Sequence, residues 1–236
     1  MTEFVFRSDS YLSELEAEVV AVTPDGGIVL DRTIFYAASG GQPADTGTLT
    51  GPTGPVLLSS TVHPDGDKAA IVHVPAAEQP SLAVGDQVTA RIDWDRRYRL
   101  MRMHTALHLL SVVFPFPVTG GSIGEEKGRL DFDMPEVPAD VGELEARLNQ
   151  YVSEALPVTD EWITDAEMAA NPGLTKTMKV QPPRGQGRVR LIRIGEVDLQ
   201  PCGGTHVRNT SEIGRLKLGK IEKKGAQNRR VSLLFA

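Results

Sequence analysis

Residues 97–108 read RYRLMRMHTALH, and this stretch decides how the rest of the chain is interpreted. The helical spacing of apolar residues in this stretch continues on both sides of it and predicts a helix over residues 94–114. The apolar residues that follow this period are Leu100, Met103, Leu107, Leu110 and Val113. On such a helix His104 and His108 stand on one face, about one turn (~5.4 Å) apart. Two imidazoles at that spacing can bind the same metal ion.

A second stretch, PCGGTH at residues 201–206, supplies a thiol and a third imidazole at the same separation. Three of the chain's five histidines and its only cysteine therefore lie in two short segments. Three imidazoles and one thiolate suit a tetrahedral ion of borderline softness, zinc before others. The sequence predicts one zinc ion, and its four expected ligands are His104, His108, Cys202 and His206.

Other interpretations of these residues remain open at this point. A single histidine is more often a hydrogen-bonded core residue than a ligand. The HTALH segment has the spacing of a zinc-protease helix but lacks the glutamate after the first histidine, so a protease is disfavoured. Cys202 could instead be a catalytic nucleophile with a histidine nearby. A site closed by four protein ligands is usually structural, whereas hydrolytic zinc keeps a position for water.

Composition places few limits on function. The 236 residues, 40% hydrophobic and 24% charged, are typical of one large domain or two ordinary ones. No apolar run is long enough to span a bilayer and the first residues do not resemble a signal peptide, so we expect a cytoplasmic protein without membrane association. A lone cysteine excludes an internal disulfide. The net charge of −6 hides basic segments at 176–193 and 215–230, which are either a polyanion footprint or solvated strand faces.

The first half alternates short strand-like runs with turns and predicts a small barrel or sandwich over residues 1–92. One loop, FYAASGGQPADTG at 35–47, stands out because Gly40 and Gly41 permit a sharp turn or a close approach to a ligand just before Gln42. A plain turn is the simpler interpretation. His63 and His73 have no partners at ligand spacing and are expected to be surface or packing residues.

The second half, residues 93–236, predicts an α+β domain with helices packed on an antiparallel sheet. We expect a linker near 90–93, then turns and one short strand over 118–134, broken at the glycines of 120–124. The other elements expected are helices at 138–156 and near 165–170, and strands at 188–194, 214–223 and 229–235.

Three motifs resemble one family: RMHTALHLL, CGGTHVRNTSEIG and the glycine loop look like the editing region of alanyl-tRNA synthetase. The closing KIEKKGAQNRRVSLL is more similar to its free-standing relatives, the AlaX-type trans-editing proteins of medium size. The editing domain of threonyl-tRNA synthetase has similar metal motifs, but the glycine loop favours the alanyl side. Ser39 departs from many of these relatives, which have a third glycine there.

The resemblance implies a barrel-like domain followed by a zinc-binding editing domain. It also implies an aminoacyl-tRNA deacylase, a carboxylic ester hydrolase that acts in trans on Ser-tRNA(Ala) or Gly-tRNA(Ala) and spares Ala-tRNA(Ala). No adenylating domain is recognised, so we expect no use of ATP. The expected oligomeric state is a monomer or a weak dimer. A rival hypothesis is a non-catalytic tRNA-binding module in which zinc only joins two segments.

Serine exceeds alanine by one oxygen, so a site that admits Ser-tRNA cannot exclude Ala-tRNA by size. A site that hydrogen-bonds the hydroxyl can discriminate by up to about 10⁴–10⁵. Thr105, beside His104, is the expected hydroxyl contact, although it can instead bond its own helix backbone. Gln42 and the loop amides of Gly40 and Gly41 are expected to orient the ester or a water. The side chains expected to contact acceptor-stem phosphates are Arg99, Arg102, Lys223, Lys224, Arg229 and Arg230.

Overall fold

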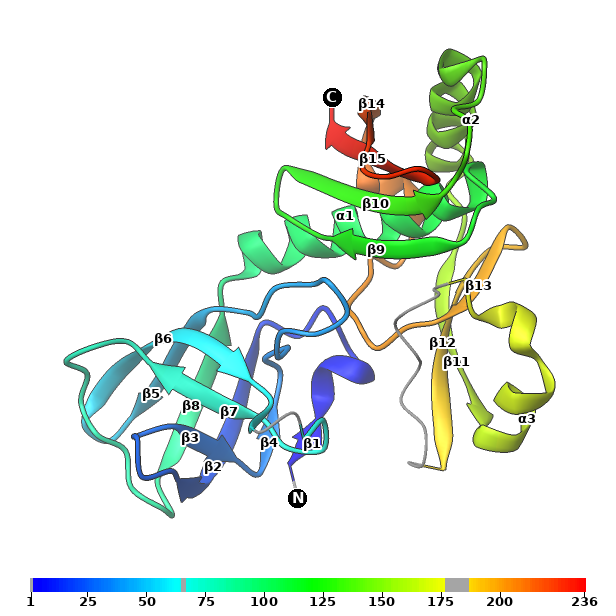
Figure 1. The fold of residues 1–236 in the computed structure, drawn as a ribbon. Coiled ribbons are helices and arrows are strands. Elements are labelled where there is room, and N and C mark those ends of the chain that lie inside the picture. Colours follow the sequence, from blue (N-terminus) through cyan, green and yellow to red (C-terminus); the bar gives the residue numbers. More distant parts are fainter. Residues whose placement is uncertain (1, 65–66, 177–186) are drawn as a thin grey trace. The chain divides into compact units, whose positions relative to one another are not determined.

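The computed structural model describes residues 2–64, 67–176 and 187–236. The chain forms two compact units, Met1–Tyr98 and Arg99–Ala236, and the division falls within helix α1, Trp94–Val113. Figure 1 shows strands dominating the first unit, with helices and strands mixed in the second. The predicted α+β class with an N-terminal barrel is confirmed. Among the described residues, no helix combines the length and the apolar composition needed to cross a bilayer.

The first unit is built around a closed barrel with the strand order β2-β3-β7-β6-β5-β8, in which every neighbouring pair is antiparallel. Its strands alternate buried and exposed residues, so the inward side chains form one core that includes Val19, Leu30 and Leu49. The barrel strands are β2 Glu14–Val22, β3 Ile28–Leu30, β5 Gly47–Gly51, β6 Gly54–Val62, β7 Val72–Pro75 and β8 Gln87–Ile92. Outside the barrel, β1 Glu3–Phe4 pairs in parallel with β4 Arg32–Thr33, and a 3-10 turn, η1 Val5–Arg7, follows β1.

The linker predicted near 90–93 is wrong. Residues 90–92 complete β8, and only Asp93 separates this strand from α1. The Asp93 carboxylate accepts a hydrogen bond from the backbone N–H of Arg96 at 3.1 Å and so caps the helix. Strand and helix therefore follow each other without a flexible connection.

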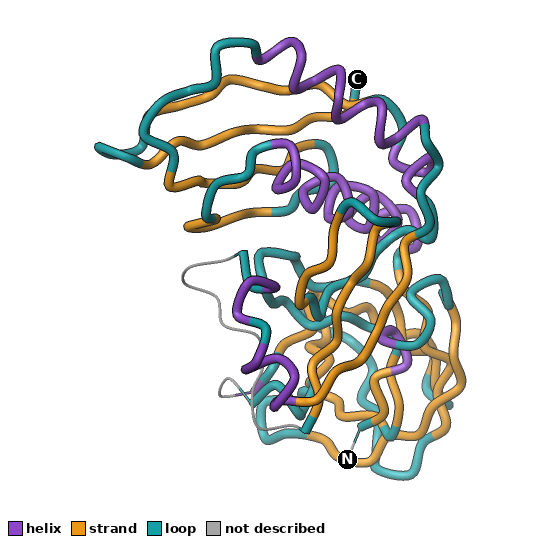
Figure 2. Tube along the Cα trace, turned by 90° about the vertical axis from the view of Figure 1, so that its right-hand side faces the viewer, coloured by secondary structure: helices purple, strands orange, loops and turns teal. Residues whose placement is uncertain are grey.

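The second unit contains a four-stranded antiparallel sheet, order β14-β15-β10-β9, and a three-stranded antiparallel sheet, order β11-β12-β13. Both long helices accompany the four-stranded sheet (Figure 2). A Cβ placed on Gly128 in β10 would lie 2.8 Å from Met103 of α1, so a glycine is needed where the helix approaches the strand. The short helix α3 packs Met168 against Val189 and Leu191 of the smaller sheet.

The elements of the second unit that follow α1 are β9 Val118–Ser122, β10 Lys127–Asp133, α2 Val141–Ser153, β11 Val158–Thr164, α3 Asp165–Ala170, η3 Pro172–Leu174, β12 Arg188–Ile194, β13 Asp198–Pro201, η4 Thr210–Ile213, β14 Leu216–Lys223 and β15 Asn228–Phe235.

Two predictions for this unit are corrected. Gly120 and Gly121 do not interrupt the strand, because both pair with β10 within β9, whereas Gly124 lies in the connection between β9 and β10, where a break was predicted. A Cβ on Gly121 of β9 would lie 2.9 Å from the side chain of Leu130 in β10, so the glycine permits a close contact between the two strands. The second helix is shorter than the predicted 138–156, and strands β11 and β13 were not predicted at all.

His73 is a packing residue in the barrel, as expected. Its Nδ1 lies 2.9 Å from the carbonyl oxygen of Ile28, so Nδ1 carries the proton, and its Nε2 accepts from the Thr33 hydroxyl at 2.8 Å. Burial lowers the pKa of His73 to about 4, despite the hydrogen bond to Ile28 that raises it. A second proton would have to enter at Nε2 and displace the Thr33 donor.

We therefore expect the first unit to lose stability in mild acid. Unfolded histidine titrates near pH 6.5, so between pH 6.5 and 4 the unfolded chain binds more protons than the folded chain. The free energy of unfolding should be unaffected above pH 6.5 and should fall by up to roughly 3 kcal/mol as the pH decreases to 4. Urea unfolding at several pH values tests this, with Trp94 as the fluorescent probe in a Trp162→Phe background. The same pH dependence in a His73→Gln variant would contradict the assignment.

Candidate metal centre

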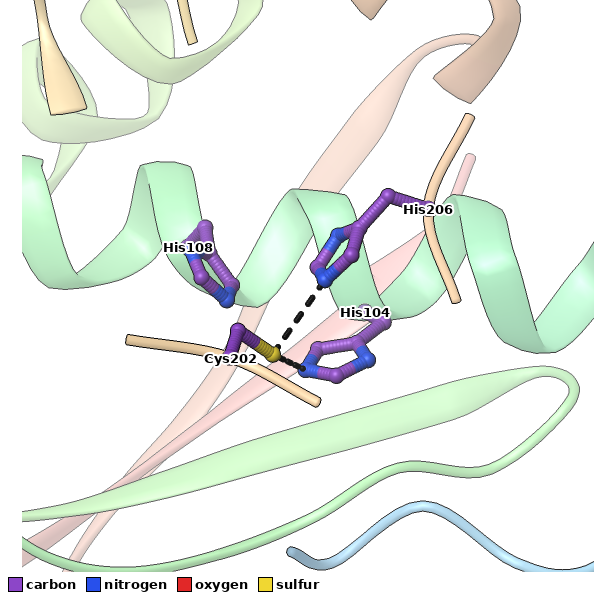
Figure 3. Close-up of side chains that lie close together, drawn as sticks. All are labelled: His104, His108, Cys202 and His206. Atoms are coloured by element: carbon purple, nitrogen blue, oxygen red, sulfur yellow. Dashed lines mark hydrogen bonds between the residues drawn. The ribbon is translucent and has the colours of Figure 1, made fainter. Parts of the chain in front are cut away.

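Helix α1 and the loop after β13 bring the four predicted ligands together. His104 and His108 project from the same face of α1, while Cys202 and His206 come from the PCGGTH segment (Figure 3). The Cys202 Sγ lies 3.4 Å from His104 Nε2 and 3.3 Å from His206 Nε2. One ligand atom from each of the four residues lies within 4.8 Å of the other three. This cluster can hold one metal ion.

The donor set fits a small tetrahedral ion. Bonds of about 2.0–2.3 Å at tetrahedral angles separate donor atoms by roughly 3.3–3.8 Å, which matches the sulfur–nitrogen distances in the cluster. The three imidazoles are buried and the thiol is half-buried, so few water molecules compete for the donors. Nitrogen and thiolate ligands favour zinc over hard ions such as Mg²⁺ or Ca²⁺.

The four groups strongly alter one another's protonation. Burial raises the pKa of the Cys202 thiol, but the charges of His104 and His206 and the hydrogen bonds with His104 and His108 outweigh burial and hold the pKa well below its usual range. Burial and the neighbouring His104 lower the pKa of His206 to about 3. The cluster therefore presents a thiolate, the form of cysteine that binds metals.

His108 differs because a buried carboxylate lies behind it. Burial lowers the pKa of His108, but hydrogen bonds with Asp198 and Cys202 outweigh this effect and raise the pKa to about 9. Burial likewise raises the pKa of Asp198, and its hydrogen bonds with His108 and Lys176 bring it below the usual value. Sequence reasoning missed Asp198. Strand alternation was the available signal, since Asp198, Gln200 and Cys202 are spaced by two.

Arg190 of β12 holds the cysteine loop in place and was counted in the sequence only as part of a basic segment. Its Nη1 donates to the carbonyl oxygens of Gly204 at 2.9 Å and Cys202 at 3.3 Å. Its own carbonyl oxygen accepts from the Cys202 N–H at 3.1 Å. Arg190 is buried, so this part of the basic segment is not a free phosphate contact. Lys179 and Arg184 of the same segment lie outside the described residues.

Thr105 lies beside the metal cluster, next to His206, and its side chain is fully buried. It donates to the carbonyl oxygen of Met101 at 3.0 Å, one helical turn earlier, and accepts from the Val207 N–H at 3.3 Å. It also lies 3.1 Å from His206 Nδ1, the ring atom opposite the Nε2 that faces Cys202. A direct contact with the substrate stays a prediction, and it would require one of these hydrogen bonds to be exchanged.

The glycine loop belongs to the first unit. Ser39 and Gln42 exchange backbone hydrogen bonds of 3.1 and 2.9 Å across Gly40 and Gly41, whose φ angles are 58° and 85°. Residues other than glycine rarely adopt such left-handed angles, which explains the two glycines. Ser39 does not have a left-handed φ, so its position does not require a third glycine. Gln42 is buried, with 2% of its surface exposed. Its role in orienting a substrate stays a prediction.

Most of the cations predicted to bind phosphates already have protein partners. Arg99 lies 3.3 Å from Glu126, and Arg102 donates to the Ile213 carbonyl oxygen at 2.7 Å while stacking over Phe235. Lys224 pairs with Glu222, Arg230 pairs with Asp131, and Arg229 donates to backbone carbonyls of Pro135, Gly225, Ala226 and Asn228. Lys223 is exposed at the end of β14. Phosphate binding by these side chains stays a prediction.

Comparisons with known proteins match both halves of the chain. A family model described as the threonyl and alanyl tRNA synthetase second additional domain matches residues 189–232, the segment that contains Cys202 and His206. A model of class II (A) tRNA synthetases matches residues 9–96.

Three relatives show how far the similarity extends. The alanyl-tRNA editing protein AlaX-M of Methanosarcina acetivorans is 38% identical over 240 residues, which covers 98% of each chain. AlaX-M of Saccharolobus solfataricus is 34% identical over 235 residues, again covering 98% of each. The alanine–tRNA ligase of Pyrobaculum calidifontis is 34% identical over 236 residues, covering 94% of this chain but 25% of the ligase.

Proposed function

This chain belongs to the AlaX-M family of alanyl-tRNA editing proteins, and from this we propose that it hydrolyses mischarged tRNA(Ala) in trans with the help of one zinc ion. The proposed substrates are Ser-tRNA(Ala) and Gly-tRNA(Ala), and Ala-tRNA(Ala) is spared. The reaction adds the hydroxide part of water to the acyl carbon and breaks the ester C–O bond. The free amino acid leaves, and the terminal ribose oxygen takes up a proton.

The observation that carries this proposal is the cluster of three buried imidazoles and one thiol within 4.8 Å. Zinc bound there would act as a Lewis acid that polarises the ester carbonyl. His104, His108, Cys202 and His206 would hold the ion. Cys202 is the least buried of the four, so it borders the side from which a substrate would approach.

The surrounding residues would keep these donors oriented. The hydroxyl of Thr105 fixes the ring of His206 through Nδ1, and Arg190 fixes the backbone on both sides of Gly203. Discrimination against alanine requires a group that pairs with the serine hydroxyl, and Thr105 stays our candidate for that contact. Gln42 and the amides of Gly40 and Gly41 are proposed to orient the ester or its attacking water. Lys223 is the most available of the proposed phosphate contacts.

The rival proposal, a binding module that does not catalyse, makes a different quantitative prediction. We expect catalytic amounts of the protein to release many equivalents of labelled serine from Ser-tRNA(Ala), while labelled alanine on the same tRNA is retained at least about 10²-fold longer. Release should weaken as salt is raised, because phosphate contacts displace counterions. Retention of the tRNA on the protein with its seryl ester intact would instead favour the binding module.

A further inference from the structure

Asp198, at the start of β13, is buried and faces three hydrogen-bond donors. Its Oδ2 lies 3.0 Å from His108 Nδ1. Its Oδ1 lies 2.6 Å from Lys176 Nζ. The side-chain nitrogen of Gln200 lies 2.9 Å from Oδ1 and 2.8 Å from Oδ2. An ionised carboxylate only accepts hydrogen bonds, so all three neighbours must donate to it.

Once His108 loses a proton to become a metal ligand, this arrangement determines which ring nitrogen keeps the remaining proton. Because Nδ1 must donate to Asp198, a neutral His108 has its lone pair on Nε2. With Nδ1 engaged by Asp198, Nε2 is the ring atom available to the cluster. The opposite tautomer would place a proton on the metal-binding atom and would point a lone pair at a carboxylate. Asp198 therefore prepares His108 to bind a metal.

A second pair of residues, Gln200 of β13 and Ser111 of α1, joins the same strand and helix beside the Asp198–His108 pair. Gln200 Nε2 donates to the Ser111 hydroxyl at 2.8 Å, and that hydroxyl donates to the carbonyl oxygen of His108 at 2.7 Å. Asp198 and Gln200 share one face of β13 because strand side chains alternate, and His108 and Ser111 share one face of α1 because they are three residues apart. Two adjacent pairs thus join the strand to the helix at the cluster.

We propose that Asp198 is a positioning residue that sets the tautomer of His108 for metal binding through one carboxylate oxygen, while its other oxygen accepts from Lys176. The inference rests on the proposed function, since it assumes that His108 binds the metal. Outer carboxylates of this kind typically contribute 10–100-fold to metal affinity.

Asparagine at this position makes the idea testable, because it has one acceptor where aspartate has two. Facing Lys176 on one side and His108 on the other, its oxygen will turn to the ammonium group and its NH₂ to His108. His108 Nδ1 must then accept, which moves the ring proton to Nε2. We expect Asp198→Asn to weaken zinc binding by about 10–100-fold.

Removing the competitor should restore the site. In the double variant Asp198→Asn/Lys176→Met the ammonium group is gone, so the asparagine oxygen is free to accept from His108 Nδ1. We expect the double variant to regain at least about half of the zinc affinity that Asp198→Asn loses, measured on a logarithmic scale. Such a result is not additive and therefore requires coupling between residues 198 and 176. If Asp198 only supported the fold, losing a second contact would weaken zinc binding further.

The measurement is the zinc dissociation constant, obtained by competition with a chromogenic chelator, together with the visible spectrum of the Co²⁺-loaded protein. Asp131→Asn is the matched control, because Asp131 also pairs with cations in the second unit, Arg129 and Arg230, and none of its recorded contacts is with the cluster. Weak binding and altered tetrahedral Co²⁺ bands in Asp198→Asn alone, with recovery in the double variant, would support the proposal. Equal affinity in Asp198→Asn and Asp131→Asn, or a double variant weaker than the single one, would overturn it.

Serine release by the wild-type protein, measured on the same preparation, separates this inference from the proposed function. Serine release together with unchanged zinc affinity in Asp198→Asn would reject the role of Asp198 and leave the proposed function intact. The expected zinc effects without serine release would uphold Asp198 and reject the editing activity. A wild-type protein that binds no zinc would overturn both.

Discussion

Replacing Cys202 with alanine should lower the rate of serine release from Ser-tRNA(Ala) by roughly 10³-fold or more. The change removes the thiolate from a cluster in which its sulfur lies 3.3–3.4 Å from two imidazoles. A metal ion that polarises a carbonyl stabilises the transition state by several kcal/mol. Each 1.36 kcal/mol of that stabilisation corresponds to a tenfold change in rate. Bound zinc per chain, measured after dialysis, should fall in parallel. The assay follows labelled serine under single-turnover conditions.

Two further variants make this result specific. His104→Ala removes a ligand of a different type from the same cluster and should behave like Cys202→Ala. His63→Ala removes an imidazole that bonds to the carbonyl oxygen of Ala70 in the first unit, and it should retain both zinc and activity. Full zinc content in a slow Cys202→Ala protein would revive the idea that Cys202 is a nucleophile rather than a ligand.

Replacing Asp45 with alanine should destabilise the first unit by about 3–5 kcal/mol, because the buried guanidinium of Arg97 would lose its only carboxylate partner among the described contacts. Arg97 and Asp45 are 0% and 1% exposed, and Arg97 Nε lies 2.9 and 3.1 Å from the two carboxylate oxygens. Asp45 also accepts from the Tyr36 N–H at 2.7 Å. The same guanidinium donates to the carbonyl oxygens of Ser10 and Ile34. This network joins the glycine loop to the start of α1.

Urea unfolding followed by Trp94 fluorescence measures this effect, because the other tryptophan, Trp162, lies in the second unit and can be replaced by phenylalanine. Glu14→Ala is the matched control, since it breaks an ion pair with Arg91 that is largely exposed and should cost about 1 kcal/mol or less. An Asp45→Leu/Arg97→Met variant should recover most of the loss, because it leaves no charge buried. A loss below 1 kcal/mol in Asp45→Ala would contradict this account.

Local periodicity explains what the sequence could predict. The helical period around His104 located α1 closely, and the strand-like runs between turns located five of the six barrel strands, the exception being β5 Gly47–Gly51. The four candidate ligands could be named because each pair lies within one short segment. What brings the two segments together is the pairing of β13 with β12 and the position of the Cys202 loop beside α1, and both depend on contacts between distant residues.

The missed elements share a physical cause. Strand β13 has only four residues and ends at Pro201, so it is too short to show a period. Strand β11 is mostly polar and owes its structure to seven paired positions along β12. Gly120 and Gly121 disfavour a strand by propensity, yet both pair with β10, and the side chain of Leu130 leaves no room for a Cβ at Gly121. Asp198 was overlooked for the same reason, since its partners His108 and Lys176 are remote in sequence.

The most direct test of the central claim is to remove the metal with a chelator and restore it in steps while serine release from Ser-tRNA(Ala) is followed. Our account predicts almost no release by the metal-free protein, a rate that rises in proportion to added Zn²⁺, and saturation at one ion per chain. Ala-tRNA(Ala) should stay intact throughout. Release of serine at the full rate by protein shown to contain no metal would contradict the account.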